Sequence, residues 1–208
     1  MFHPAGHPLE RGWVGRLDGD RVVQLAAQTL QSFFTGGGSA REHAEYPLAE
    51  VVLLAPVLHP PSVRVFDDQR SFAFANPAAI VGPGAVVHAP GDTLSRGSLT
   101  VVPRLAAVIG AHGAIAGFTG FADWRASALE APKDHDFALG LGPVVVTPDE
   151  VTGTSGFDWG AAADFAAAGT VLYPGDILAG PALRAIEAVS DVSLAIDGIG
   201  VLEQRVAR

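Results

Sequence analysis

His135 is the residue in this sequence best suited to move a proton near neutral pH. An unperturbed histidine has a pKa of about 6.5, so it can accept and return a proton under physiological conditions. His135 stands between Asp134 and Asp136, and Lys133 is close by in the same polar segment. The two carboxylates could hold a cation, although a short solvated acidic run is the commoner explanation. A lone loop histidine is also more often solvated or hydrogen-bonded than catalytic, so both interpretations stay open.

Other familiar catalytic patterns are missing from the sequence or have simpler explanations. There is no cysteine, which excludes disulfides and thiolate metal sites, and there is no Gly-x-Ser-x-Gly nucleophile turn. His3 and His7 are four residues apart, but the prolines around them prevent a helix that would align them as metal ligands. The three glycines at 36–38 lack the Gly-Lys-Ser/Thr of a phosphate-binding loop, so they predict a flexible connection.

Composition and charge exclude several classes of protein. The 208 residues suit one large domain, or a main domain with a small appendage. Hydrophobic residues make up 49% of the chain, but the apolar runs are too short to span a bilayer. A net charge of −9 disfavours binding to nucleic acid, and the first residues lack the pattern of a signal peptide. We therefore expect a cytoplasmic protein that binds neither nucleic acid nor membranes.

The first quarter of the chain predicts a small N-terminal subdomain. Residues 13–27 have the pattern of a hairpin turning at Asp18-Gly19, and apolar spacing over 22–34 predicts a helix that ends at the glycines. A short buried strand is expected at 51–54, and the prolines that follow it indicate a boundary. We place the N-terminal subdomain at residues 1–58 and the main body at residues 59–208.

The main body has the pattern of a β-rich α+β domain. Its β-branched residues and turn signals predict many short strands. Strands are expected at 85–88, 98–109 and 144–147, an alanine-rich helix at 161–168, and a last hairpin made by 192–196 and 200–206.

Eight segments, in order along the chain, resemble those of the fumarylacetoacetate hydrolase family. They are residues 16–23, 60–64, 76–84, 105–110, 117–124, 141–150, 173–177 and 196–202. The resemblance implies a mixed β-roll body with few helices and a homodimer. Members of the family cleave, decarboxylate or tautomerise dicarbonyl-type acids with Mg²⁺ or another divalent cation.

The same resemblance implies that the metal site of the family is eroded here. In the family, a Glu-x-Glu pair and an aspartate hold a hard cation that polarises the carbonyl groups of the substrate. Strand alternation directs the two glutamates to one face, but the matching residues here are Val102 and Arg104. Asp123 keeps the aspartate position. We therefore expect no cofactor, while weak residual binding of Mg²⁺ at Asp123 stays open.

The remaining candidate residues also follow from the resemblance. His135 matches the position of the family's lysine, and Lys133, two residues earlier, is a possible substitute. The candidate catalytic residues are therefore His135, Asp123 and Lys133. Arg104 and Arg125 are the candidate substrate-binding residues, because two guanidinium groups could clamp a carboxylate. We also expect Asp123 to be buried and paired with Arg104.

Three functions are compatible with these features. The first is a pseudoenzyme or binding protein that keeps a pocket for a small acidic metabolite, such as a dicarbonyl or keto acid. The second is an active enzyme with altered, metal-independent chemistry, in which Arg104 stabilises an enolate and His135 or Asp123 moves the proton. The third is a structural or regulatory partner of an intact paralogue. Fold alone does not decide between them.

Overall fold

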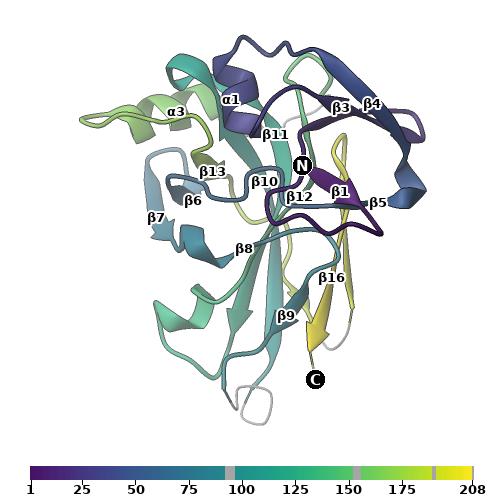
Figure 1. Ribbon diagram of the computed structural model, residues 1–208. Helices are drawn as coiled ribbons and strands as arrows, with labels where there is room; N and C mark the ends of the chain where they lie inside the picture. The colour runs from purple at the N-terminus through teal and green to yellow at the C-terminus, as the bar shows by residue number, and fades with distance from the viewer. Residues whose placement is uncertain (92–96, 152–155, 189–190, 208) are drawn as a thin grey trace.

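A curled sheet forms the body of the protein in the computed structural model, which describes residues 1–91, 97–151, 156–188 and 191–207. Within these residues the sheet has eight strands in the order β7-β6-β13-β10-β11-β12-β8, and β14 pairs with the start of β10 (Figure 1). The strands are β6 (Val63–Asp68), β7 (Ser71–Ala75), β8 (Ile80–Val81), β10 (Leu99–Ile109), β11 (Ile115–Ala126), β12 (Leu139–Val146), β13 (Ile177–Ala179) and β14 (Ile186–Glu187).

Strands β10 and β11 are the centre of this sheet, and both are buried along most of their length. They run antiparallel, with Val102 opposite Asp123 and Arg104 opposite Phe121. Directly opposed residues in an antiparallel pair share one face of the sheet. The two strands therefore place Arg104 and Asp123 on the same face, in the middle of the molecule.

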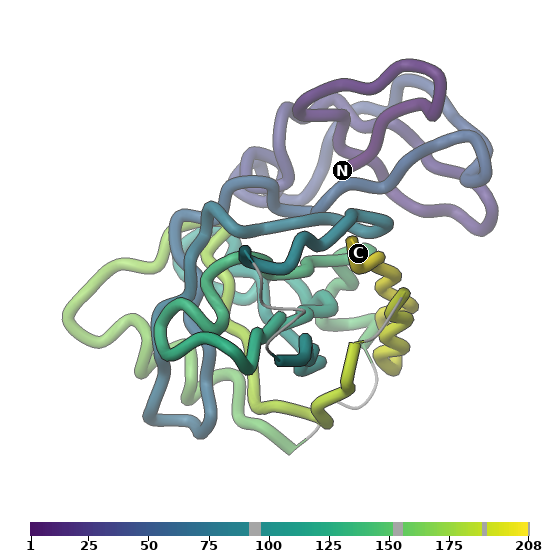
Figure 2. The backbone as a smooth tube through the Cα atoms, turned by 90° about the horizontal axis from the view of Figure 1, so that it is seen from below, coloured from purple at the N-terminus to yellow at the C-terminus, as the bar shows by residue number. Residues whose placement is uncertain are grey.

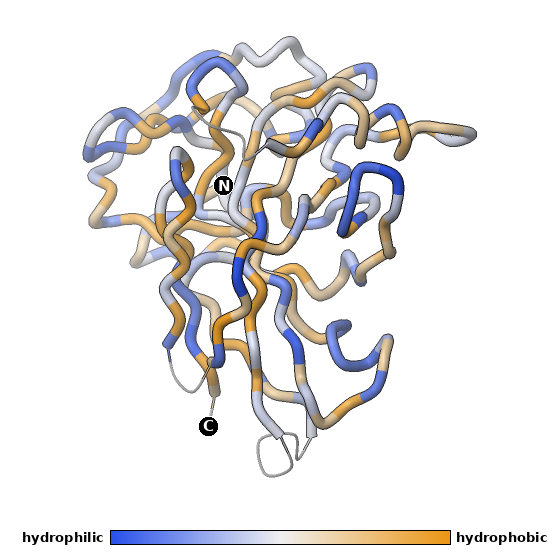
Figure 3. The backbone as a smooth tube through the Cα atoms, turned by 180° about the vertical axis from the view of Figure 1, so that it is seen from behind, coloured by the Kyte–Doolittle hydropathy of each residue, from blue (hydrophilic) through white to orange (hydrophobic). Residues whose placement is uncertain are grey.

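Three layers cover the sheet, and hydrophobic residues run through the centre of the molecule (Figure 3). Helix α3 (Trp159–Ala167) covers one face, where Trp159 packs against Phe118. The short helix α1 (Leu30–Thr35) packs against the opposite face. The hairpin of β15 (Val192–Ile196) and β16 (Gly200–Ala207), to which β9 (Val86–His88) is paired, covers another part of the face that holds α3 and packs against Trp124.

The N-terminal strands form two small sheets of their own, which share no strand pairing with the main sheet among the described residues. We call this part the N-terminal lobe; Figure 2 shows it in purple and blue beside the body. Its elements are β1 (Phe2–Pro4), β2 (Gly15–Asp18), β3 (Arg21–Leu25), α1, β4 (Glu42–Pro47) and β5 (Val51–Leu53). The division of the chain between residues 58 and 59 stays a prediction.

Short 3₁₀ helices connect several strands. They are η1 (Leu48–Glu50), η2 (Pro77–Ala79), η3 (Ala111–Gly113) and η4 (Lys133–His135). Of these, η4 lies beside the C-terminal part of β11 and brings a loop against the central strands. Among the described residues, no helix is long and apolar enough to cross a membrane.

The β-rich fold class and the β-roll body are confirmed, but two local predictions were wrong and two elements begin earlier than expected. The helix expected over 22–34 is restricted to Leu30–Thr35, because Val22 and Val23 pair with β4 in a sheet. The strand near 51–54 exists, but it is not buried, since Val52 is 40% exposed. The strand expected at 144–147 begins at Leu139, and the helix expected at 161–168 begins at Trp159.

Candidate functional site

A fully buried aspartate, Asp123, lies at the centre of the candidate site. Its side chain is 0% exposed, and its Oδ2 atom accepts hydrogen bonds from two arginines. The Nη2 atom of Arg104 lies 3.3 Å from Oδ2, and the Nη2 atom of Arg125 lies 2.8 Å from it. Arg104 reaches it from the neighbouring strand, while Arg125 is two residues further along β11 on the same face. The predicted contact between Arg104 and Asp123 is therefore present.

Arg104 is held by backbone groups as well as by the carboxylate. Its Nη1 atom donates to the carbonyl oxygens of Phe66 and Gly180, at 3.3 and 3.0 Å. The Arg104 side chain is only 4% exposed, so these hydrogen bonds and the carboxylate must compensate for the cost of burying its charge. Asp67 adds a weaker contact at 3.8 Å from a side chain that is 87% exposed. The guanidinium is therefore a structural part of the sheet's core.

Helix η4 brings a histidine and a second carboxylate to the same place. The Nδ1 atom of His135 lies 3.9 Å from Asp123 Oδ1, and its Nε2 atom lies 3.8 Å from Asp134 Oδ1. Arg125 Nη1 lies 3.7 Å from the other oxygen of Asp134. Asp123 Oδ1 and His135 Nδ1 are buried and have no hydrogen-bond partner within the described chain. This pair of unsatisfied atoms is the most unusual polar feature of the site, because buried polar groups normally have partners.

Lys133 does not join the cluster. Its side chain is 73% exposed, and its Nζ atom lies 2.6 Å from Asp136 Oδ2 instead of contacting Asp123. This hydrogen bond holds the pKa of the Asp136 carboxyl below its usual range. The structure thus brings together four of the five candidate residues and places Lys133 on the outside.

Asp134 was considered as part of a cation-holding pair but was not among the candidate catalytic or binding residues. In the sequence it belongs to a short acidic run, which is typical of a solvated loop. In the structure its side chain is only 22% exposed and lies between Arg125 and His135. Its position next to His135 in the chain was the single available signal.

The residues around Asp123 do not fit a divalent metal ion. Mg²⁺ and Mn²⁺ prefer several oxygen ligands around one point. Val102, which lies directly opposite Asp123, offers no ligand atom, and two guanidinium groups occupy Asp123 Oδ2. Over the ranges that the structure describes, no group of three or more histidine, aspartate or glutamate side chains converges.

The fold is shared with several enzymes of known structure. A maleylpyruvate hydrolase from Sphingobium sp. SYK-6, in complex with manganese(II) ion and pyruvate, has a TM-score of 0.78 at 19% identity, over 95% of this chain and 97% of that one. A 5-carboxymethyl-2-hydroxymuconate delta-isomerase from Mycobacterium smegmatis has a TM-score of 0.70 at 23% identity, over 94% of both chains. A 2-keto-3-deoxy-D-arabinonate dehydratase complexed with magnesium and 2,5-dioxopentanoate has a TM-score of 0.76 at 17% identity, over 99% and 96%.

At these identities the likeness shows the fold alone. No family model matches the sequence. No curated protein matches it either. The fold is nevertheless the one that the resemblance to the fumarylacetoacetate hydrolase family implies, and it extends over almost the whole chain.

The geometry allows two kinds of chemistry. Arg125 is the cation of the cluster that solvent can reach, since 35% of its side chain is exposed, so it can meet an anionic group. The side chain of His135 is 16% exposed and lies against the buried oxygen of Asp123, so it can take up or hold a proton. Arg104 is too buried to meet a ligand unless the loops around it move.

Proposed function

We propose that this chain is a fumarylacetoacetate hydrolase family member that has lost metal-dependent carbon–carbon hydrolysis and binds a small acidic metabolite of the keto-acid type. The observation that carries the proposal is the Arg104 guanidinium, which lies 3.3 Å from Asp123. In the family, a carboxylate that binds the metal stands at the position of Arg104. A fixed positive charge here repels a divalent cation and supplies Asp123 with a counter-charge.

Arg125 is the residue that we expect to bind the ligand. Its Nε and Nη2 atoms face Asp123, while its Nη1 atom makes only a 3.7 Å contact with Asp134. A ligand carboxylate can therefore take the Nη1 side by displacing a weak contact from a partly exposed aspartate. The complexes of the similar structures with pyruvate and with 2,5-dioxopentanoate support a ligand of this class.

A second function, as a metal-independent enzyme, is favoured by His135 Nδ1 and Asp123 Oδ1, which are buried close together without hydrogen-bond partners among the described residues. In a metal-independent tautomerase or decarboxylase of a β-dicarbonyl acid, His135 would move the proton. Asp123 would orient the imidazole, and Arg125 would stabilise the negative charge of an enolate. The homodimer and the cytoplasmic location also remain predictions.

Thermal unfolding with Mn²⁺ tests the loss of the metal site. We expect no saturable stabilisation of the natural chain. The variant with Val102→Glu and Arg104→Glu should gain one, because two new carboxylates would then share one face with Asp123 and binding to the folded state raises its stability. Adding Asp123→Asn to this variant should abolish the gain. Saturable stabilisation of the natural chain that Asp123→Asn removes would contradict the proposal.

Calorimetric titration with pyruvate and oxalate in the presence of a chelator tests ligand binding. We expect Arg125→Gln to weaken binding at least tenfold, while Arg21→Gln, a change in an exposed arginine of the N-terminal lobe, leaves it unchanged. The two proposed functions are separated by incubation with oxaloacetate and an acylpyruvate under the same conditions. Turnover that His135→Gln abolishes favours the enzyme, and binding without turnover favours the pseudoenzyme. If neither acid binds and neither substrate is consumed, both functions are wrong.

A further inference from the structure

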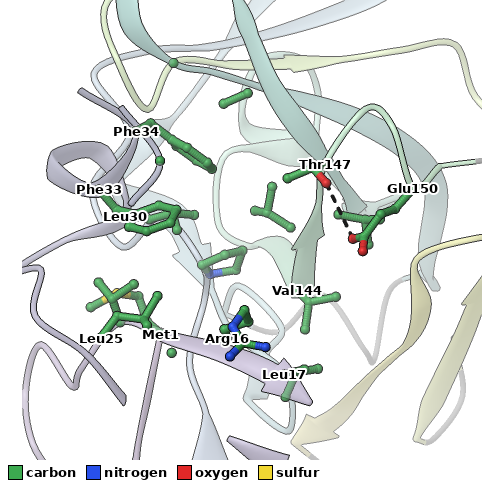
Figure 4. A pocket seen from close by; sticks show the side chains of 18 of the residues that line it. Met1, Arg16, Leu17, Leu25, Leu30, Phe33, Phe34, Val144, Thr147 and Glu150 are labelled. Carbon is green, nitrogen blue, oxygen red and sulfur yellow. Dashed lines mark hydrogen bonds between the residues drawn. The ribbon is translucent and has the colours of Figure 1, made fainter. Parts of the chain in front are cut away.

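A large cavity lies between the N-terminal lobe and the body, away from the Asp123 cluster. Its volume is about 910 Å³, which is within the range of small-molecule binding sites. Strands β2 and β3 and helix α1 form one wall, and the β10–β11 turn with the end of β12 forms the other (Figure 4). We call it the interlobe pocket. From Arg104 to the end of β10 at Ile109 the strand extends for about 17 Å, so the pocket is separate from the candidate site.

Several of the apolar side chains that line the interlobe pocket are only partly buried. Helix α1 has no fully buried residue, although Leu30, Phe33 and Phe34 all face the pocket (Figure 4). Across from them, Ile115 and Val144 are also only partly buried. When an apolar ligand enters a concave space and excludes water from apolar side chains on both sides, the free energy of the system falls. The walls therefore favour an apolar occupant.

The charges at the rim disfavour an anion. Among the described lining residues, Arg16 is the side chain with a positive charge, and it is paired with Glu42 at 2.7 Å and with Asp18 at 3.4 Å. The hydrogen bond to Glu42 raises the pKa of the Arg16 guanidinium above its usual value. Glu150, on the opposite rim, accepts a 3.4 Å hydrogen bond from Thr147 and adds a negative charge. Met1 also lines the pocket, and burial lowers the pKa of its α-amino group to about 6. At neutral pH, no unpaired cation among the described lining residues is therefore left for a ligand carboxylate or phosphate.

We propose that the interlobe pocket binds an uncharged, mainly apolar small molecule with the size of two or three rings. This site is independent of the keto-acid site proposed above, and its ligand has the opposite character. Phe33 and Phe34 provide an aromatic wall whose ring centroids are 5.6 Å apart, which suits a ligand with a planar ring.

Two fluorescent probes with the same aromatic skeleton test the proposal. N-phenyl-1-naphthylamine is uncharged, and 8-anilinonaphthalene-1-sulfonate carries one negative charge. We expect the uncharged probe to bind saturably with one site per chain, at least tenfold more tightly than the sulfonate. Val144→Phe should weaken its binding at least tenfold by filling the pocket. Val171→Phe, at a valine that is 61% exposed and does not line the pocket, is the matched control.

If Val144→Phe lowers the melting temperature, Phe33→Ser replaces it, with Phe74→Ser at an exposed position as the control. Arg125→Gln should leave probe binding unchanged, which separates this result from any failure of the keto-acid site. The proposal is overturned if the uncharged probe does not saturate. It is also overturned if the sulfonate binds as tightly, or if pocket and control variants behave alike.

Discussion

Replacement of Arg104 by methionine should cost far more stability than the loss of an ordinary arginine. Arg104 is 4% exposed and forms hydrogen bonds with Asp123 and with two backbone carbonyl groups. Methionine fills a similar volume but leaves a fully buried carboxylate with Arg125 as its one remaining close cation. Breaking a buried pair by removing one partner typically costs about 3–5 kcal/mol. For a chain of this length, that corresponds to a fall in melting temperature of roughly 6–20 °C.

The assay is urea unfolding followed by tryptophan fluorescence, since Trp124 follows Asp123 in β11 and is fully buried on the other face of the sheet. Arg21→Met is the matched control. The Arg21 ion pair with Glu45 is short, at 2.8 Å, but about half of each side chain is exposed. Such surface pairs contribute about 0–1 kcal/mol, so the control should lose little.

A double variant separates the lost charge pair from lost packing. When Asp123→Leu accompanies Arg104→Met, no carboxylate is left unpaired, and Arg125 can turn toward solvent or Asp134. We expect the double variant to lose less stability than the sum of the two single variants, by about 1–3 kcal/mol. If Arg104→Met costs no more than Arg21→Met, or if the two changes add without coupling, the reasoning about the buried pair is refuted.

Three smaller predictions follow from individual hydrogen bonds. Lys133→Gln should raise the pKa of Asp136 in an NMR titration toward the ordinary value for aspartate. The stability that this contact supplies is present above that ordinary value and is lost as pH falls through the lowered pKa. Gln204→Leu should cost about 1–3 kcal/mol in urea unfolding, because the buried Trp124 indole N–H loses its acceptor at 2.7 Å; an unchanged midpoint would show that another acceptor replaces it. Thr29→Ala should cost about 1 kcal/mol in the same assay, because Thr29 caps α1, and Thr29→Ser is the conservative control.

The main sheet could be predicted where local pattern and tertiary burial agree. The apolar, β-branched run of β10 is typical of a strand that is buried on both faces, and it is buried here. The last hairpin alternates between buried and exposed residues in β15, as its sequence pattern predicts. In both segments the pattern of apolar residues was sufficient to define the strand.

Elsewhere, tertiary contacts overrode the local pattern. The apolar spacing over 22–34 matches a helix, but the β-branched Val22 and Val23 gain a partner in β4, an exposed polar edge strand that has no hydrophobic pattern. The start of β12 was missed because Gly140 is more typical of a turn. A Cβ atom there would lie 2.8 Å from that of Ala122 and still closer to the Gln204 amide, so glycine is required by packing.

The candidate site was predictable where strand geometry fixes side chains, and not where loops do. Arg104 and Asp123 share a face because β10 and β11 are regular neighbours, so their contact follows from alternation and register. The positions of Lys133 and Asp134 depend on the path of the loop that contains η4. A one-residue difference in that path decides which side chain points inward, and the sequence holds no periodic signal for it.

The two edges of β10 are completed at very different times during synthesis. One edge pairs with β11, which follows directly in the chain, while on the other edge Ala106 pairs with Ala179. Until the ribosome has released β13, β10, which is buried along almost its whole length in the finished fold, presents an open edge to its surroundings. Unpaired apolar edges are where growing chains aggregate, and long-range pairing slows folding. Even if the folded protein is stable, the yield of soluble protein in recombinant expression should therefore depend on translation speed and on the supply of chaperones.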